Sequence, residues 1–276
     1  MPNPGALISL TITRVTCRLA LVTCHLSLVT LVGCRVSLSP VKNRVGVGVE
    51  SYVFFDADGE DGQGDLYVGS ASGGKVFRAT FTRVHESSPA LSPNGIMLAF
   101  IRGSHAADSA GHRVWVMNLM NGAEREVPEP GAGAFPQRLA WSLDGTTLYV
   151  RTSRGDFQTA APPADPRLVA VDRASQAAAD TALRVPLGLP VIAIAEPCDS
   201  GGGICARTPS GAQRLSPVGR DAFRWGADSV GYFIGNGIEV RPLGGGSTRQ
   251  LRWTGIPSPP RTATQFPGLA PADQNR

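Results

Sequence analysis

The stretch that decides the fold is Ser88-Pro-Ala-Leu-Ser-Pro-Asn-Gly-Ile-Met-Leu-Ala-Phe100. It contains a short apolar strand, a polar turn that closes on Asn-Gly, and a second apolar strand. Asn-Gly tolerates positive φ, which a tight hairpin turn requires. The same order of features returns, with Asp-Gly in the turn, at Pro136-Gln-Arg-Leu-Ala-Trp-Ser-Leu-Asp-Gly-Thr-Thr-Leu-Tyr-Val150. The interval of about 50 residues between the copies indicates a radially repeated β architecture.

Similar units recur along the chain at the spacing of propeller blades. Apolar strands are expected near residues 52–55, 97–101, 147–150, 191–195 and 229–234, and their starts are separated by 45, 50, 44 and 38 residues. A strand, a Gly- or Asn-rich turn and a polar strand follow, at 65–78, 113–126, 166–174, 203–215 and 236–249. Each hairpin pair has one apolar face that it cannot bury alone, so blades stacked around an axis would supply the core.

The composition agrees with an all-β fold and disfavours a nucleic-acid-binding protein. The 276 residues include 33 glycines and 22 prolines, and only 17% are charged, which fits many tight turns. The net charge is +4, but the basic residues are scattered. Residues 1–34 contain two arginines and no acid, so 24 basic and 22 acidic residues remain beyond them. No nucleic-acid partner is therefore expected.

The repeats resemble the TolB-type, or WD40-like Pro-Asp-repeat, β-propeller family. Blades of that family carry a pattern close to Pro-x-Trp-Ser-Pro-Asp-Gly, followed by an Ile/Leu-Ala-Phe strand. Residues 89–127 match best, with Leu91 in place of the Trp and Asn94 in place of the Asp. The second copy restores both residues, as Trp141 and Asp144. The resemblance implies an all-β fold, a propeller of about five to six four-stranded blades.

Two tryptophans of the repeats indicate how the blades pack. Trp141 and Trp225 are expected to fill the wedges between neighbouring blades, and stacking on a ligand is the alternative.

The propeller domain is expected over 45–253. Residues 254–276 contain five prolines and no strand pattern, which predicts a disordered tail. The alternative is that 45–49 and 254–276 complete a further, degenerate blade.

The first residues have the features of a bacterial export signal. Two arginines precede a mostly apolar segment, Leu19 to Gly33, that is too short and too polar for a good transmembrane helix. It ends in Leu31-Val32-Gly33-Cys34, which resembles the lipobox of bacterial lipoproteins. The resemblance implies cleavage before Cys34 and lipidation of its thiol, with residues 35–44 as a tether. An ordinary secretory signal and an uncleaved anchor are the alternatives.

Localisation and cysteine usage agree with export. Arg35 rather than Asp follows the lipidated position, which favours the outer membrane if the host is Gram-negative. Beyond the leader only two cysteines remain, Cys198 and Cys205, separated by Asp-Ser-Gly-Gly-Gly-Ile. In an oxidising compartment this spacing predicts one local disulfide. A metal site there is disfavoured because no further cysteine pair or nearby histidine completes four ligands.

The most tempting ligand site is the acidic stretch from Asp56 to Asp65. Its alternating carboxylates resemble the calcium loops of integrin-type blades, and the candidate ligands are Asp56, Asp58, Asp61 and Asp65. Glu60 shifts the register, so that Asp61 stands where an EF-type loop requires Gly. A solvated turn is therefore favoured, with no metal and no cofactor expected, and calcium remains the alternative.

No catalytic motif is recognised. Gly69-Ser-Ala-Ser-Gly73 has Ala71 where a nucleophile elbow requires Ser, and His85-Glu86 lacks the second histidine of a zincin. The favoured hypothesis is an envelope-anchored, non-enzymatic propeller that binds an envelope protein or peptide. The alternatives are a propeller enzyme, either hydrolase or lyase, and a calcium-dependent adhesion module.

Overall fold

The computed structural model describes residues 41–269, except 42, 105–110, 130–132, 163, 165, 185–193, 199–201, 209–210 and 227. Cys34 and the rest of the expected leader lie outside the described residues. The described part is almost entirely β-strand, with one helix, α2 (Gln176–Arg184). No described helix has the length and apolar character needed to cross a membrane.

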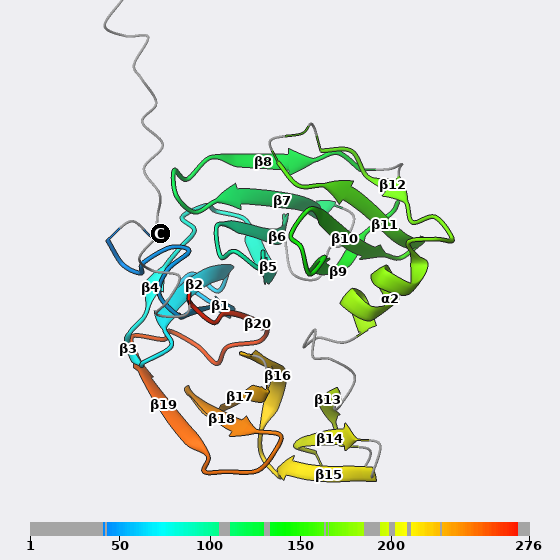
Figure 1. Cartoon of the computed structure of the whole chain (residues 1–276). Coiled ribbons are helices and arrows are strands. Elements are labelled where there is room, and N and C mark those ends of the chain that lie inside the picture. The colour runs from blue at the N-terminus through cyan, green and yellow to red at the C-terminus, as the bar shows by residue number, and fades with distance from the viewer. Residues whose placement is uncertain are drawn as a thin grey trace, which may run out of the picture. The chain divides into compact units, whose positions relative to one another are not determined.

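The strands form five sheets, each built mainly from strands that are consecutive in the chain (Figure 1). Sheet one orders β20 (Ala263–Phe266), β1 (Tyr52–Asp58), β2 (Gly64–Ser70) and β4 (Phe77–Arg78). Sheet two orders β5 (His85–Leu91), β6 (Met97–Gly103), β7 (Arg113–Asn118) and β8 (Glu124–Val127). Sheet three orders β9 (Pro136–Trp141), β10 (Thr147–Thr152), β11 (Gly155–Ala160) and β12 (Val169–Ala170).

The last two sheets complete the described strands. Sheet four orders β13 (Ile194–Pro197), β14 (Ile204–Thr208) and β15 (Gly211–Ser216). Sheet five orders β16 (Arg220–Trp225), β17 (Ser229–Ile234), β18 (Gly237–Pro242), β19 (Arg249–Thr254) and β3 (Gly74–Lys75). Five of the expected apolar strands thus correspond to β1, β6, β10, β13 and β17, although residues 191–193 lie outside the described part.

Sheet one is buried on both faces, as a blade between two neighbours must be. Alternate residues of a strand point to opposite faces. On β1, Val53 and Phe55 belong to a core cluster with residues of sheets four and five, including Phe233. Tyr52 and Phe54 belong instead to a cluster with residues of sheet two. Sheets two and three share a third cluster, so the packing order is four, five, one, two, three.

The repeated motif of the sequence forms the same turn twice. In each copy the Ser hydroxyl donates a 2.6 Å hydrogen bond to the side chain two residues later, Asn94 or Asp144. The same hydroxyl accepts a 2.9 Å hydrogen bond from the amide five residues later, in Met97 or Thr147. The glycine of each turn has φ of 67° or 71°. The motif is therefore a structural device that turns the chain between the first two strands of a blade.

Tryptophan side chains join neighbouring sheets. Trp141 Nε1 donates a 2.9 Å hydrogen bond to the Ala90 carbonyl of sheet two, which confirms its expected place between blades. Trp225 is half-buried against the core of sheets four and five. A third tryptophan, Trp253, joins sheets five and one, because its Nε1 donates a 3.0 Å hydrogen bond to the Ser70 carbonyl.

The expectation of a disordered tail from Thr254 is wrong for the residues that form β20. This strand pairs antiparallel with β1, with Tyr52 opposite Phe266 and Phe55 opposite Ala263. The edge strand of sheet one is thus supplied by the far end of the chain, and this segment completes the first blade rather than a further blade of its own. Phe266 is buried in the cluster between sheets one and two, which explains why this segment is ordered without a strand pattern of its own.

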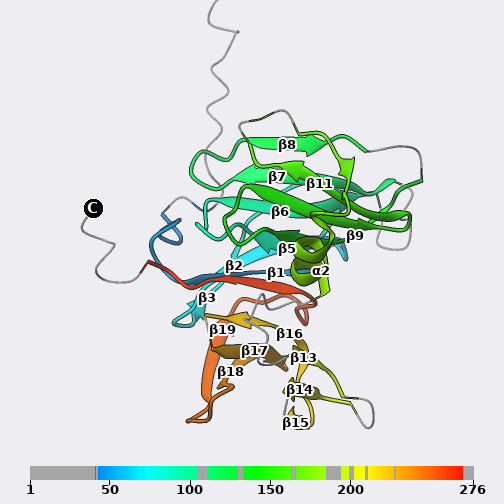
Figure 2. The same cartoon turned by 45° about the vertical axis from the view of Figure 1, so that its right-hand side comes forward.

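The expected tether also begins to pack earlier than the sequence indicates. Val41 and Val45 are buried in the cluster between sheets one and two. The segment that precedes β1 and the last described residues lie side by side in both views (Figures 1 and 2), and the Leu269 amide donates a 2.9 Å hydrogen bond to the Val49 carbonyl. Both ends of the described chain therefore meet at the same end of sheet one.

Candidate functional site

The strands have two ends with different connections, which we call the loop end and the turn end. The loop end carries residues 59–63, 79–84 and 255–262, and the turn end carries the repeated turns 92–96 and 142–146. β5 runs from the loop end at His85 to the turn end at Leu91. All four candidate calcium ligands of the sequence lie on or beside the loop end.

The first two candidate ligands, Asp56 and Asp58, are both paired with Arg261. Asp56 is buried and accepts hydrogen bonds from Arg261 Nε and from the Thr262 amide, each 3.0 Å long. The Thr262 hydroxyl donates a further hydrogen bond to the same carboxylate. Asp58 forms an ion pair of 2.8 Å with Nη2 of Arg261. These carboxylates therefore hold the loop that leads into β20.

The other two candidates lie elsewhere. Asp61 caps the exposed turn, where its Oδ1 accepts a 3.1 Å hydrogen bond from the Gln63 amide. Asp65 is fully buried and its Oδ1 forms a 2.6 Å ion pair with Nη2 of Arg78. Within the ranges that the structure describes, no group of three or more His, Cys, Asp or Glu side chains is arranged to hold a metal ion. Three of the four candidates are thus paired with two arginines, and Asp61 holds its own turn.

A second buried ion pair lies on sheet two beside the same loops. Glu86 is fully buried, and its Oε1 accepts 2.8 Å hydrogen bonds from Arg102 Nε and from the Thr82 hydroxyl. Arg102 also forms a 2.7 Å ion pair with Glu124. Burial lowers the pKa of Arg102, but Glu124 and Glu86 outweigh it and raise that pKa overall. The guanidinium lies 4.5 Å from the centre of the Trp115 ring, a cation–π contact.

Two histidines pack together at the loop end. The His85 and His112 rings are stacked with centres 6.3 Å apart. His85 Nδ1 accepts a 3.1 Å hydrogen bond from the Gly64 amide. Burial, and then the charge of Arg261, lower the pKa of His85, so the ring is neutral at pH 7. A Cβ at Gly64 would lie 2.3 Å from the His85 ring, so glycine is required for this contact.

The buried charges converge on the loop 79–84, between β4 and β5. Arg78 Nε donates a 2.7 Å hydrogen bond to the Thr80 carbonyl, while Glu86 holds the Thr82 hydroxyl. Between these two fixed points Phe81 is 70% exposed, more than any other aromatic side chain among the described residues. The Arg78 guanidinium lies 5.6 Å from the Phe81 ring centre. The two ion pairs therefore fix a loop that presents an aromatic side chain to solvent.

The raised pKa of Asp65 gives a pH test of this network. Burial raises the pKa of Asp65 to about 6, although Arg78 lowers it. The folded protein thus binds a proton near pH 6 that the unfolded chain binds only near 3.8. As pH falls from 7 to 4, the wild type should gain stability relative to an Asp65→Asn variant by up to about 1 kcal/mol per pH unit.

Denaturant titrations of both proteins between pH 4 and 8 measure this difference. The other titrating groups are common to both proteins, so their contributions cancel in the difference in the free energy of unfolding. The slope of this difference against pH therefore reports Asp65 alone. A constant difference would show that the carboxyl has an ordinary pKa. A slope of the opposite sign would show that the ion pair with Arg78 outweighs burial.

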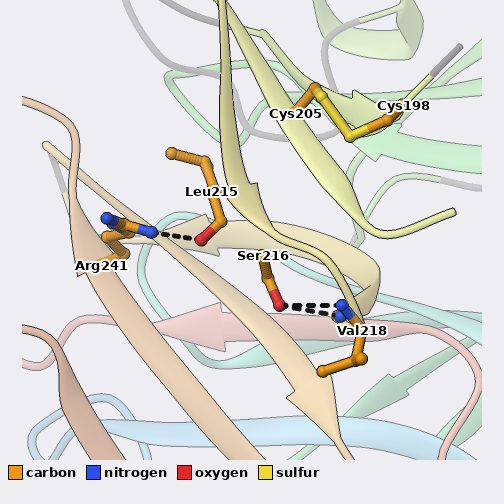
Figure 3. Close-up of a disulfide and its surroundings, with 7 residues drawn as sticks. Cys198, Cys205, Leu215, Ser216, Val218 and Arg241 are labelled. Carbon is orange, nitrogen blue, oxygen red and sulfur yellow. Dashed lines mark hydrogen bonds between the residues drawn. A yellow bond between two sulfur atoms is a disulfide. The ribbon is translucent and has the colours of Figure 1, made fainter. Parts of the chain in front are cut away.

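The disulfide lies away from this cluster, in sheet four. Cys198 and Cys205 are bonded, with Cα atoms 5.0 Å apart, and the bond closes the hairpin between β13 and β14 (Figure 3). Arg241 of sheet five donates a hydrogen bond to the Leu215 carbonyl. The Ser216 hydroxyl accepts hydrogen bonds from the amides of Val218 and Gly219, 3.3 Å and 2.9 Å long (Figure 3). The disulfide is a local staple in a region held to sheet five.

The sequence alone did not single out Phe81, Arg78, Arg102 or Arg261. Phe81 stands between two threonines in the connection between two blades, and an aromatic residue in such a connection is the signal that could have found it. The arginines carry no local signal, because their carboxylate partners are fixed by the fold. His105, which shares a connection with His112, lies outside the described residues.

Comparisons with known proteins give likenesses of structure only. No family model and no curated protein matches the chain. TolB from Acinetobacter baumannii is similar with a TM-score of 0.40 and 10% identity, over 78% of this chain and 54% of that one, so the chain spans about half of TolB. A putative TolB from Agrobacterium tumefaciens has a TM-score of 0.31 and 12% identity, over 79% of this chain and 74% of that one.

A structure of a nidogen/laminin complex is also similar, with a TM-score of 0.37 and 12% identity, over 79% of this chain and 81% of that one. The five sheets, their order of packing and the return of β20 to sheet one identify the fold as a β-propeller.

Proposed function

We propose that this protein is a propeller lipoprotein, anchored to the cell envelope through Cys34, that binds a protein or peptide partner and catalyses no reaction. The observation that carries the proposal is Phe81, an exposed aromatic side chain on a loop fixed by buried charges. Aromatic residues dominate the energy of many protein interfaces. A fixed loop loses little conformational entropy when a partner binds, which favours affinity.

The surroundings of Phe81 indicate the chemistry of the partner. Arg83 is exposed two residues further along the loop, and the Arg78 guanidinium is about one-third exposed beside the ring. A partner that fits this loop offers an apolar pocket with acidic groups at its edge. Because the arginine charges lie at the rim of such a contact, they would speed association more than they would strengthen it.

The state of the buried polar groups supports binding rather than catalysis. The carboxylates of Asp56, Asp65 and Glu86 accept hydrogen bonds or form ion pairs with arginines. The His85 Nδ1 atom is engaged by a backbone amide. The hydrogen-bonded oxygens stabilise the loops. The second oxygens of Asp65 and Glu86 have no hydrogen-bond partner but are buried, whereas a general base needs an accessible lone pair directed at a substrate.

The leader supports the proposed location. The lipobox-like Leu31-Val32-Gly33-Cys34 follows an apolar segment, and the arginine after it favours the outer membrane if the host is Gram-negative. The disulfide between Cys198 and Cys205 agrees with folding in an oxidising compartment. Cys34 lies outside the described residues, so its acylation is tested directly, by mass spectrometry of the amino-terminal peptide.

The partner test uses chemical crosslinking in intact cells that express the full chain from its own leader. Captured proteins are identified and quantified by mass spectrometry. A Phe81→Ala variant should bind the partner about thirtyfold more weakly or worse and recover correspondingly less of it, since loss of an interface hot spot costs about 2 kcal/mol or more. Its thermal unfolding should be unchanged, because the side chain is mostly exposed.

The matched control is Val169→Ala, which shortens an exposed apolar side chain on β12. It should leave recovery of the partner at the wild-type level. Equal recovery with both variants would remove Phe81 from the interface, and recovery of no single protein in stoichiometric amount would overturn the scaffold proposal.

A further inference from the structure

The turn end carries exposed apolar side chains that the core does not use. Leu143 is 78% exposed and Met120 is 59% exposed, at the tips of sheets three and two. Val49 and Leu269, beside the start of β1 and the end of β20, are 44% and 39% exposed. We call these four side chains, together with the exposed Pro93, the apolar rim. Exposed apolar side chains gathered at one end of a protein are candidates for an interaction surface.

The apolar rim spans the turn ends of three neighbouring sheets. Leu269 is joined to Val49 by a backbone hydrogen bond. A Cβ at Gly48 would lie 3.3 Å from Ile96, whose carbonyl accepts a 2.8 Å hydrogen bond from the amide of Leu119, next to Met120. A Cβ at Gly145, two residues after Leu143, would lie 3.3 Å from Pro93. The exposed side chains thus follow one edge, from sheet one through sheet two to sheet three.

The chain leaves the described structure at the same end. Val41 is buried in a cluster with residues at the turn end of their strands, such as Leu91, Leu98 and Phe266. Cys34 precedes Val41 by seven residues, and seven residues span at most about 25 Å when fully extended. A lipid on Cys34 would therefore hold the turn end close to the membrane surface.

We propose that the apolar rim lies against the lipid bilayer, with its tips among the headgroups and the upper acyl chains. This inference rests on the proposed anchor at Cys34. Small apolar tips on rigid turns suit this boundary, because they enter the interface while the backbone keeps its hydrogen bonds. The carboxylate of Asp144, next to Leu143, is held inside its own turn by Ser142 and Thr146, which leaves Leu143 as the tip.

The same orientation places Phe81 away from the membrane. β5 has seven residues, so about 20 Å separates the loop before it from the turn after it. With the apolar rim on the bilayer, the loop end faces outward. To bring the loop end to the bilayer instead, the residues between Cys34 and Val41 would have to spend about 20 Å of their maximum of about 25 Å on running back along the side of the propeller.

The test measures the depth of both ends in the lipidated full chain. The protein is reconstituted into vesicles of phosphatidylethanolamine and phosphatidylglycerol, with or without brominated acyl chains, which quench tryptophan at short range. Leu143→Trp adds a tryptophan at the apolar rim, and Phe81→Trp adds one at the loop end. We expect the bromolipid to quench the fluorescence added at 143 at least twofold more than that added at 81, above the common background of the four native tryptophans.

Two further readouts separate the possible failures. Vesicle flotation shows whether the protein is bound, and the mass of its amino-terminal peptide shows whether Cys34 carries acyl chains. Equal quenching at both positions in an acylated, floating protein overturns the orientation but leaves the proposed anchor intact. A protein without acyl chains overturns the anchor and, with it, the orientation.

Discussion

A chain that ends after Thr254 is expected not to fold to a stable propeller. The truncation removes β20, and with it Phe266, whose burial against sheets one and two is worth about 3–5 kcal/mol by analogy with Phe→Ala changes in cores. It also removes Arg261 and Thr262, which leaves the buried Asp56 carboxylate without its partners, at a cost of about 3–5 kcal/mol. Together these losses match the whole stability of a typical domain, about 5–15 kcal/mol.

Size-exclusion chromatography and near-ultraviolet circular dichroism measure this outcome. The truncated chain should elute as expanded or aggregated material and show no cooperative thermal transition. The control is a chain that ends after Leu269, which retains every described contact of β20 and should keep the wild-type transition. A cooperative transition at the wild-type temperature in the shorter chain would show that β20 is an accessory strand.

Much of the fold could be predicted because its signals are local. The hairpins β5–β6 and β9–β10 show apolar strands joined by Ser-x-Asn/Asp-Gly turns, and the structure contains both. β20 has no such signal: Ala263-Thr-Gln-Phe266 does not alternate apolar and polar residues, and prolines precede it. Its pairing joins Tyr52 with Phe266, and this pairing forms only when the two ends of the propeller domain meet. A window along the chain cannot detect a partner more than 200 residues away.

The candidate site was only partly predictable for the same reason. The acidic stretch was visible in the sequence, but the expected solvated turn is wrong for Asp56 and Asp65, which are buried on β1 and β2. Their partners were not visible, because Arg261 approaches Asp56 and Asp58 from the other end of the chain. Charge spacing alone could suggest a cation for these oxygens. It could not show that an arginine already supplies the positive charge.

Replacement of Arg102 by methionine is expected to lower the free energy of unfolding by about 3–5 kcal/mol. Methionine keeps much of the apolar stem, so the packing beside Trp115 is largely preserved while the charge is lost. The fully buried Glu86 then has no cation, which is the costly part of breaking a buried ion pair. Because Glu86 also holds Thr82, the loop that carries Phe81 should loosen, and recovery of the partner should fall with stability.

A double-mutant cycle with Glu86→Gln isolates the buried charge. In the Glu86→Gln background there is no buried carboxylate that could lose its cation. Arg102→Met should therefore lower the free energy of unfolding by only about 1 kcal/mol, the scale of a neutral hydrogen bond. Arg252→Met, at an exposed arginine on β19, should change stability by no more than about 0.5 kcal/mol. The free energy of unfolding of each variant is measured by denaturant titration at pH 7. Equal losses in both backgrounds would mean that Arg102 acts through its packing on Trp115 and Phe100, and that the ion pair does not hold the loop of Phe81.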